Sequence, residues 1–273
     1  MRLMTALLVA ALSGTAAAAN PEPVDIASGD LTLHAVVYRP DGNGPFPAVV
    51  ALHGCGGLTV TGGAVAPRYA DWGERLAAEG FVVLFPDSYA SRGLGSQCSV
   101  RDPVARSRRE RVTDANAARR WLQSQDFVRR DRVSLVGWAN GGIAALWTIG
   151  RHAVLKRDGN DFRSAVAFYP GCRRLAESAW SARQPTLLLL AAADDWAAPG
   201  PCEQMVAGAR GRSARVTVIV YSGAHHDFDH PNLPLADHSG LAFTADGSGR
   251  AHAGTDPVAR ADALKRVPAW LKR

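Results

Sequence analysis

The sequence predicts an α/β fold: one domain in which a doubly wound, mostly parallel β-sheet is flanked by helices. The order of the segments along the chain favours this fold. Short apolar runs, typical of buried strands, alternate along the chain with longer segments of helical periodicity. Strands and helices that alternate in this way form parallel sheets with right-handed crossovers. The 273-residue chain fits one such domain, expected over residues 20–273, and contains no stretch typical of an interdomain linker.

Seven segments are expected to form the strands. Residues 31–38 alternate apolar and polar side chains, so this segment is expected to be an antiparallel strand at an edge of the sheet. The remaining segments are apolar almost throughout, as in strands that are buried on both faces. They cover residues 48–52, 81–85, 132–136, 165–169, 186–190 and 216–221.

Helices are expected between most of these strands and at the end of the chain. Residues 68–78 show helical periodicity and stop just before Gly80, a residue typical of helix C-termini. Pro268 is expected to disturb the last helix, because proline cannot donate a main-chain hydrogen bond. The other helices are expected over residues 104–123, 140–150, 202–209 and 259–271.

The N-terminus has the pattern of a secretory signal peptide. Arg2 supplies a positive charge, residues 3–12 are apolar, and residues 17–19 are small, as at a cleavage site. The alternative is a buried first helix. No later stretch is long and apolar enough to cross a bilayer, so no membrane association is expected. The mature protein is therefore expected to begin at residue 20 and to be periplasmic or secreted.

The formal net charge of +6 comes largely from arginines between residues 101 and 132. These arginines are interleaved with acids and alanines, which is typical of a solvated helix face. No aromatic residues are interleaved with them, and export also argues against a nucleic-acid partner. A mild attraction for anionic substrates is the alternative use of this charge.

Four cysteines in an exported chain are candidates for disulfide bonds, and they allow three connectivities. Cys172 and Cys202 follow two neighbouring strands of the expected sheet, so we expect them to pair. Cys55 and Cys98 follow another two neighbouring strands and form the second expected pair. No Cys/His spacing is typical of a zinc site, and neither a metal nor a cofactor is expected.

Residues 133–142 read as a buried strand, a tight turn and the start of a helix. This is the layout of the nucleophile elbow of α/β-hydrolases, with its pattern G-x-S-x-G. Gly137 and Gly141 supply the flanking glycines, but the central residue is Ala139, which has neither a hydroxyl nor a thiol. Ser134 lies inside the strand and Cys55 belongs to another loop, so neither lies on this turn.

Three further segments carry the other parts of a hydrolase site. Residues 47–57 form an apolar strand that ends in His-Gly-Cys-Gly-Gly, as in the oxyanion-hole loops of these enzymes. A second strand ends in Asp194-Asp195, and a third leads to His225-His226. A nucleophile position, then an acid, then a histidine is the chain order of the α/β-hydrolase triad.

Together, six segments of the sequence resemble the dienelactone hydrolase family of α/β-hydrolases. The resemblance covers nearly the whole mature chain and implies an α/β-hydrolase fold that hydrolyses esters or lactones with a Ser or Cys nucleophile, a His base and an Asp. The sequence departs from the family at Ala139, so activity is expected to be lost or severely reduced. The six segments are residues 53–57, 87–93, 137–142, 169–172, 194–196 and 223–228.

The resemblance assigns His226 as the base and Asp194 as the acid that orients it. His225 and Asp195 are the alternatives for these two roles.

Four more residues complete the expected site. The main-chain N–H groups of Cys55 and Asn140 are the expected oxyanion donors. Arg92 could hold a substrate carboxylate by a forked hydrogen bond, or it could form a surface salt bridge. Trp138 and Trp196 could line the site or belong to the core.

Residues 229–255 are rich in Gly, Pro, Asp and His and are expected to form a long excursion near the active site.

Two explanations of Ala139 stay open at this point. Either it replaces a Ser or Cys and would trap a substrate complex, or it is natural. In the second case the chain would be an exported pseudoenzyme that binds a small molecule on the same fold. The expected partner is a small ester or lactone in both cases.

Overall fold

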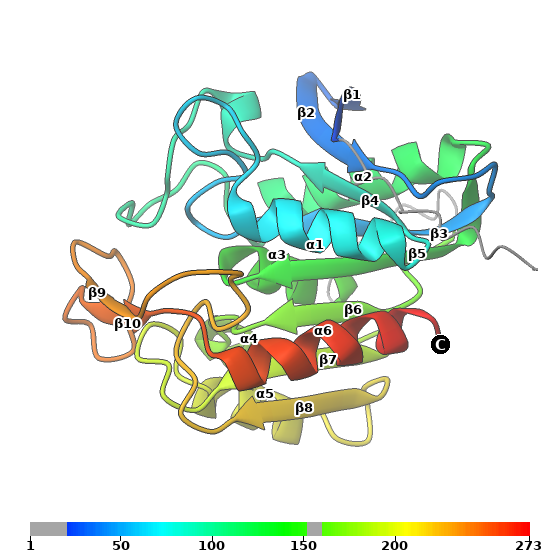
Figure 1. Cartoon of the computed structure of the whole chain (residues 1–273). Helices are drawn as coiled ribbons and strands as arrows, with labels where there is room; N and C mark the ends of the chain where they lie inside the picture. The colour runs from blue at the N-terminus through cyan, green and yellow to red at the C-terminus, as the bar shows by residue number, and fades with distance from the viewer. Residues whose placement is uncertain (1–20, 152–159) are drawn as a thin grey trace, which may run out of the picture.

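The computed structural model describes residues 21–151 and 160–273 (Figure 1). The expected signal peptide, residues 1–19, lies outside the described residues. The described part of the chain forms one eight-stranded sheet and a separate two-stranded sheet. None of its helices is long and apolar enough to cross a membrane.

The large sheet has the strand order β1-β2-β4-β3-β5-β6-β7-β8. Strand β2 is antiparallel to both β1 and β4, and all other neighbouring strands are parallel. This arrangement confirms the predicted α/β class. The strands are β1 (Glu22–Ser28), β2 (Leu31–Tyr38), β3 (Phe46–Leu52), β4 (Val82–Pro86), β5 (Val128–Trp138), β6 (Ala165–Phe168), β7 (Thr186–Ala191) and β8 (Val216–Tyr221).

The expectation that residues 31–38 form an edge strand is wrong. Strand β1 lies outside β2 and pairs with it along its whole length, joined by a tight turn at Gly29 with φ +63°. Strand β1 was not predicted, because its alternation is short: only Ile26 and Ser28 are buried. The edges of the large sheet are therefore β1 and β8.

Helices cover both faces of the sheet (Figure 1). The apolar sides of α1 and α6 pack in one hydrophobic core, and those of α2, α3, α4 and α5 pack in the other. Because both faces are covered, strands β4, β6 and β7 are buried at every residue. The helices are α1 (Pro67–Ala78), α2 (Glu110–Ser124), α3 (Asn140–Ile149), α4 (Arg173–Glu177), α5 (Gly200–Gly208) and α6 (Pro257–Leu271), with a single 3-10 turn, η1 (Ala90–Arg92).

Two helix predictions need correction. Helix α2 begins at Glu110 and not at residue 104. The Glu110 carboxylate accepts hydrogen bonds from the main-chain N–H and the guanidinium of Arg106, which holds the preceding residues in turns. Pro268 lies inside α6, which continues through it to Leu271.

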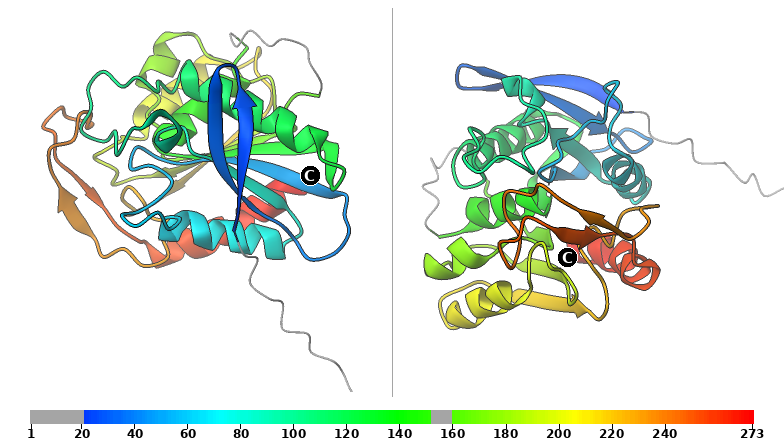
Figure 2. Two further views of the ribbon diagram at one scale, coloured as in Figure 1. Left: turned by 90° about the horizontal axis from the view of Figure 1, so that it is seen from above. Right: turned by 90° about the vertical axis from the view of Figure 1, so that its left-hand side faces the viewer.

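The excursion over residues 229–255 contains the two-stranded sheet of β9 (Ala236–His238) and β10 (Ala251–Ala253). It lies beyond the carboxyl ends of the parallel strands, as Figure 1 and the right-hand view of Figure 2 show. Ala253 forms a parallel bridge with His226, and the main-chain N–H of Gly254 donates to the carbonyl of His226. The excursion is thus attached to the segment that carries the predicted base.

Candidate functional site

The turn between β5 and α3 has the strained shape that its sequence predicts. Ala139 lies between the two elements with φ 48° and ψ −113°. This region is sparsely populated by residues other than glycine and costs about 1–3 kcal/mol. The turn is held from both sides, because Ala139 donates to the carbonyl of Phe168 at 3.0 Å and accepts from the N–H of Ile143 at 2.9 Å.

The two flanking glycines are required by close packing. A Cβ atom on Gly137 would lie closer than 3.0 Å to the main chain of Gly141, and real Cβ atoms essentially never come that close. A Cβ atom on Gly141 would collide in the same way with the carbonyl of Leu52 in β3. The turn therefore presses directly against the end of β3, where the predicted oxyanion loop begins.

His226 and Asp194 are in direct contact at the carboxyl edge of the sheet. The two atoms His226 Nδ1 and Asp194 Oδ2 lie 2.8 Å apart, and both side chains are buried. The other oxygen of Asp194 accepts the main-chain N–H groups of Trp196 and Ala197. Because a carboxylate only accepts hydrogen bonds here, Nδ1 carries a proton and Nε2 is left to exchange one.

The two alternative residues form a different pair. Asp195 binds His252 through both the imidazole, at 2.7 Å, and the main-chain N–H. The His225 ring lies against the His252 ring, with 5.9 Å between their centres. Asp195 and His225 therefore attach the excursion to the ends of β7 and β8, which favours His226 and Asp194 for the base and the acid.

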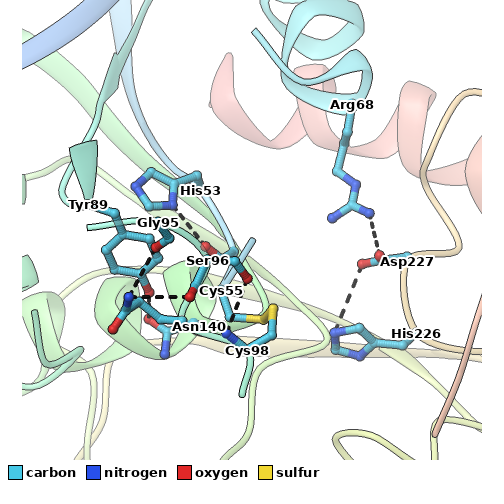
Figure 3. The surroundings of a disulfide bond; sticks show 12 residues. His53, Cys55, Arg68, Tyr89, Gly95, Ser96, Cys98, Asn140, His226 and Asp227 are labelled. Atoms are coloured by element: carbon cyan, nitrogen blue, oxygen red, sulfur yellow. Dashed lines mark hydrogen bonds and ion pairs between the residues drawn. A yellow bond between two sulfur atoms is a disulfide. The ribbon is translucent and has the colours of Figure 1, made fainter. Parts of the chain in front are cut away.

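A second carboxylate and an arginine flank His226, and the sequence reasoning missed both. Asp227 Oδ1 lies 4.0 Å from His226 Nε2, and the other oxygen of Asp227 is 2.7 Å from Arg68 Nη2 (Figure 3). The Arg68 side chain comes from the first turn of α1 and is buried. Residues 68 and 227 are distant in sequence, so no spacing pattern connects them.

These charges set the protonation of the site. Burial of His226 would by itself lower its pKa, but the nearby carboxylates of Asp194 and then Asp227 outweigh burial and raise the pKa above its usual value. Burial would raise the pKa of Asp227, but Arg68 and His226 outweigh it and lower that pKa. Asp227 is therefore a carboxylate at neutral pH.

The two predicted tryptophans differ in position. Trp196 lies beside the His226 ring, 4.8 Å between centres, and Tyr169 lies 4.6 Å from the same ring. Trp138 is fully buried, and its indole N–H donates to Asp229 at 2.7 Å. Trp138 thus belongs to the core, while Trp196 lies at the site.

The predicted oxyanion loop follows β3 and touches the elbow. An ideal Cβ atom on Gly54 would lie 3.7 Å from the Cβ of Ala139, so the two turns are in contact. The N–H of Gly54 already donates to the Tyr69 hydroxyl. Within the described residues, the N–H groups of Cys55 and Asn140 donate to no other group.

Both expected disulfides are present. Cys55 pairs with Cys98, and Cys172 pairs with Cys202. Figure 3 shows that the Cys55–Cys98 bond lies beside Asn140, on the side of the site that faces His226. The first disulfide thus ties the predicted oxyanion loop to the segment at Cys98.

Arg92 is already paired. Its two terminal nitrogens each lie 2.8 Å from an oxygen of the buried Asp114, and one also donates to the carbonyl of Ser88. This pairing favours a structural salt bridge over a contact with substrate.

Arg111 corrects the expectation of a solvated arginine face. Its side chain is 0% exposed, and its guanidinium contacts the Asn140 side chain and the main-chain carbonyl of His53, just before the predicted oxyanion loop. His53 lies beside it, and burial and then Arg111 lower the pKa of His53 well below its usual value. The His53 imidazole is therefore neutral, with Nδ1 bonded to the carbonyl of Gly54 and Nε2 accepting the N–H of Ser88.

Comparisons with known proteins agree with this fold. The family model described as the dienelactone hydrolase family matches residues 33–273. A solved structure of a putative dienelactone hydrolase from Klebsiella pneumoniae matches with a TM-score of 0.67 and 19% identity, over 94% of this chain and 100% of that chain.

Two further solved structures share the fold. A dienelactone hydrolase-like promiscuous phosphotriesterase, P91, from metagenomic libraries has a TM-score of 0.71 and 19% identity, over 94% of this chain and 98% of that chain. Esterase 2 of Thermogutta terrifontis, phosphorylated by paraoxon, has a TM-score of 0.60 and 17% identity, over 77% and 85%.

Proposed function

Because this chain belongs to the dienelactone hydrolase family, we propose that it is an exported scaffold for ester or lactone hydrolysis whose nucleophile position is Ala139. As it stands, the chain has lost turnover or retains very little. The shape of the turn at Ala139 carries this proposal. A strained conformation persists only where its surroundings enforce it, and here it has the form that presents a nucleophile in a hydrolase.

The remaining residues have the chemistry for the other roles. With a hydroxyl at position 139, His226 Nε2 would take its proton as the oxygen attacks the ester carbonyl. Asp194 would hold the imidazole and stabilise the imidazolium. The N–H groups of Cys55 and Asn140 would stabilise the oxyanion, and the proton would then pass to the leaving alkoxide. Water would cleave the acyl-enzyme by the same route.

Without that hydroxyl, two outcomes compete. Water activated by His226 could attack a bound ester, because loss of a triad member typically leaves roughly 10³–10⁴-fold catalysis over water. Alternatively, the chain binds a small molecule without converting it. Ala139 itself is the observation that favours this second candidate function.

Export is part of the proposal. Two disulfides are typical of proteins from oxidising compartments. They support the expectation of a signal peptide over residues 1–19 and a single mature domain over residues 20–273.

The test is to restore the nucleophile. We expect Ala139→Ser to raise kcat/KM for 4-nitrophenyl butyrate by at least roughly a thousandfold over the chain as it stands, given how strongly nucleophile loss lowers turnover. Ala139→Gly is the matched control, because it changes the same turn without adding a nucleophile. His226→Ala in the Ala139→Ser background should return activity to the level of the alanine form.

A restored protein that folds normally but remains as inert as the alanine form would refute the assignment of this triad. Measurable hydrolysis by the unmodified chain that depends on His226 would favour water activation over simple binding.

A further inference from the structure

The guanidinium of Arg111 is a buried positive charge whose direct partners are all neutral. Nη1 donates to Asn140 Oδ1 at 2.6 Å, and Nη2 donates to the main-chain carbonyl of His53 at 2.6 Å. Nη1 also lies 3.4 Å from the Tyr89 hydroxyl, and Nε has no partner. Within the described residues, no carboxylate oxygen lies within 4.0 Å of this guanidinium.

The acidic residues of the same region are engaged elsewhere. Asp114, one turn further along α2, accepts both nitrogens of Arg92. Asp87 accepts hydrogen bonds from the main-chain N–H groups of Tyr89 and Ala90. Its carboxylate lies 3.7 Å from the His53 imidazole and forms no ion pair with Arg111 within the described residues. A buried charge without a bonded counterion is costly, so its persistence calls for an explanation.

Its two strongest contacts both lead to the proposed oxyanion donors. Asn140 supplies one donor N–H and offers its side chain to Arg111. The carbonyl of His53 precedes Gly54 and Cys55, and Cys55 supplies the other donor. Tyr89, which donates to Asn140 Oδ1 at 3.2 Å, completes the contact; Figure 3 shows it beside Asn140 and His53.

We propose that Arg111 is a positioning residue that makes the oxyanion site selective for a full negative charge. It fixes the two donor segments through Asn140 and His53, and its own charge acts on whatever oxygen they hold. The inference rests on the proposed function, because it takes Cys55 and Asn140 as the oxyanion donors. The ligand class is an anion: the tetrahedral oxyanion of a restored enzyme, or a carboxylate bound by the chain as it stands.

The physical reason is differential binding. A neutral ester gains little from a nearby cation, whereas the oxyanion that forms from it gains much in a poorly solvated site. Removal of the charge should therefore lower kcat and leave KM nearly unchanged. A merely structural arginine would affect both, in step with folding stability.

The turnover experiment uses the Ala139→Ser background and 4-nitrophenyl butyrate. We expect Arg111→Met to lower kcat by roughly tenfold to a hundredfold, with KM changed by less than about threefold. Arg111→Lys keeps the charge but not the forked contact, so it should retain clearly more kcat than Arg111→Met. Arg108→Met removes the same charge at an exposed position and serves as the control.

The binding experiment uses the unmodified chain, so it does not depend on turnover. Calorimetry at pH 8 compares 4-phenylbutyrate with 4-phenylbutyramide, which differ in charge and little in shape. We expect the carboxylate to bind at least roughly tenfold more tightly, and Arg111→Met to abolish that preference.

Equal affinities for carboxylate and amide, or no carboxylate binding, would overturn the inference. The inference would also be overturned if Arg111→Lys and Arg111→Met lost kcat equally, and if each loss were explained by a lower melting temperature. An inert Ala139→Ser form would instead refute the proposed hydrolase function, and the binding comparison would still decide the role of Arg111.

Discussion

The two sides of the site are built by different means. The elbow side, from β3, β5 and α3, is shaped by main-chain contacts, with glycines at 137 and 141 and a strained residue at 139. The acid–base side, at the ends of β7 and β8, is shaped by charged side chains, Asp194 and Asp227 around His226. The turn at residue 139 therefore keeps its shape without a functional side chain, whereas the acid–base side depends on the charges of Asp194 and Asp227.

The largest effect should come from the glycines of the elbow side. Gly141→Ala places a Cβ against the main-chain carbonyl of Leu52, which cannot move without displacing β3. We expect a loss of at least about 4 kcal/mol in unfolding free energy, or failure to fold. Urea denaturation measures it.

Gly142→Ala is the matched control, because its Cβ would lie 3.2 Å from the carbonyls of Gly137 and Phe168 and 3.3 Å from the Pro170 side chain. These contacts are tight but need shifts of only a few tenths of an ångström, so we expect a clearly smaller loss than for Gly141→Ala. A similar loss of unfolding free energy in both variants would show that the contact between Gly141 and the Leu52 carbonyl does not determine the shape of the elbow.

The two disulfides allow an intermediate test. They join residues 43 and 30 positions apart, so loop closure predicts nearly equal losses, about 3–4 kcal/mol, when each pair is replaced by alanine. Function should separate them. In the Ala139→Ser background, loss of Cys55–Cys98 should lower kcat at temperatures where the protein is folded, because Cys55 carries a proposed oxyanion donor.

Loss of Cys172–Cys202 should leave kcat nearly unchanged under the same conditions and serves as the control. Equal kcat values for the two folded variants would argue against an oxyanion role for the loop at Cys55.

The smallest effect should be a shift in pH dependence on the acid–base side. His226 must be neutral to accept a proton, and its pKa is raised above the usual histidine value. The activity of the Ala139→Ser form should therefore rise with pH, and the midpoint of this acidic limb of the pH profile should lie above the usual histidine value. Arg68 lowers the pKa of His226 and pairs with Asp227. Arg68→Met should therefore move this limb to still higher pH.

The pH profile of kcat/KM reports this shift. Asp227→Asn removes the opposing charge, so it should move the limb to lower pH. If both variants moved the limb in the same direction, Arg68 and Asp227 would not act on His226 through their charges.

The elbow side could be predicted from the sequence, whereas Arg68 and Asp227 on the acid–base side could not. Gly137 and Gly141 are required by local contacts whose spacing is visible in the chain, and the pairings of cysteines followed from strand order. Arg68 and Asp227 meet only through the tertiary fold, so periodicity gave no signal for them. The sequence predicts a solvated face for the arginines of α2, because only packing distinguishes the buried Arg111 and Arg119 from the others.

Strand β1 and the start of α2 were missed for related reasons. The alternation in β1 is brief, and it is completed only by pairing with β2. The residues before Glu110 have a composition suited to a helix, but the main-chain N–H of Arg106 donates a hydrogen bond to the Glu110 carboxylate, which holds them in turns.

The open edge at β8 has a consequence for behaviour in solution. Its six residues, Val-Thr-Val-Ile-Val-Tyr, contain no charge and no proline, and no described strand covers their outer side. Segments of this composition pair between molecules when an edge is exposed. Arg215, directly before the strand, is the nearest charged residue that opposes such pairing. Aggregation on partial unfolding is therefore expected to begin at β8, and a lysine in place of the exposed Val220 should delay it.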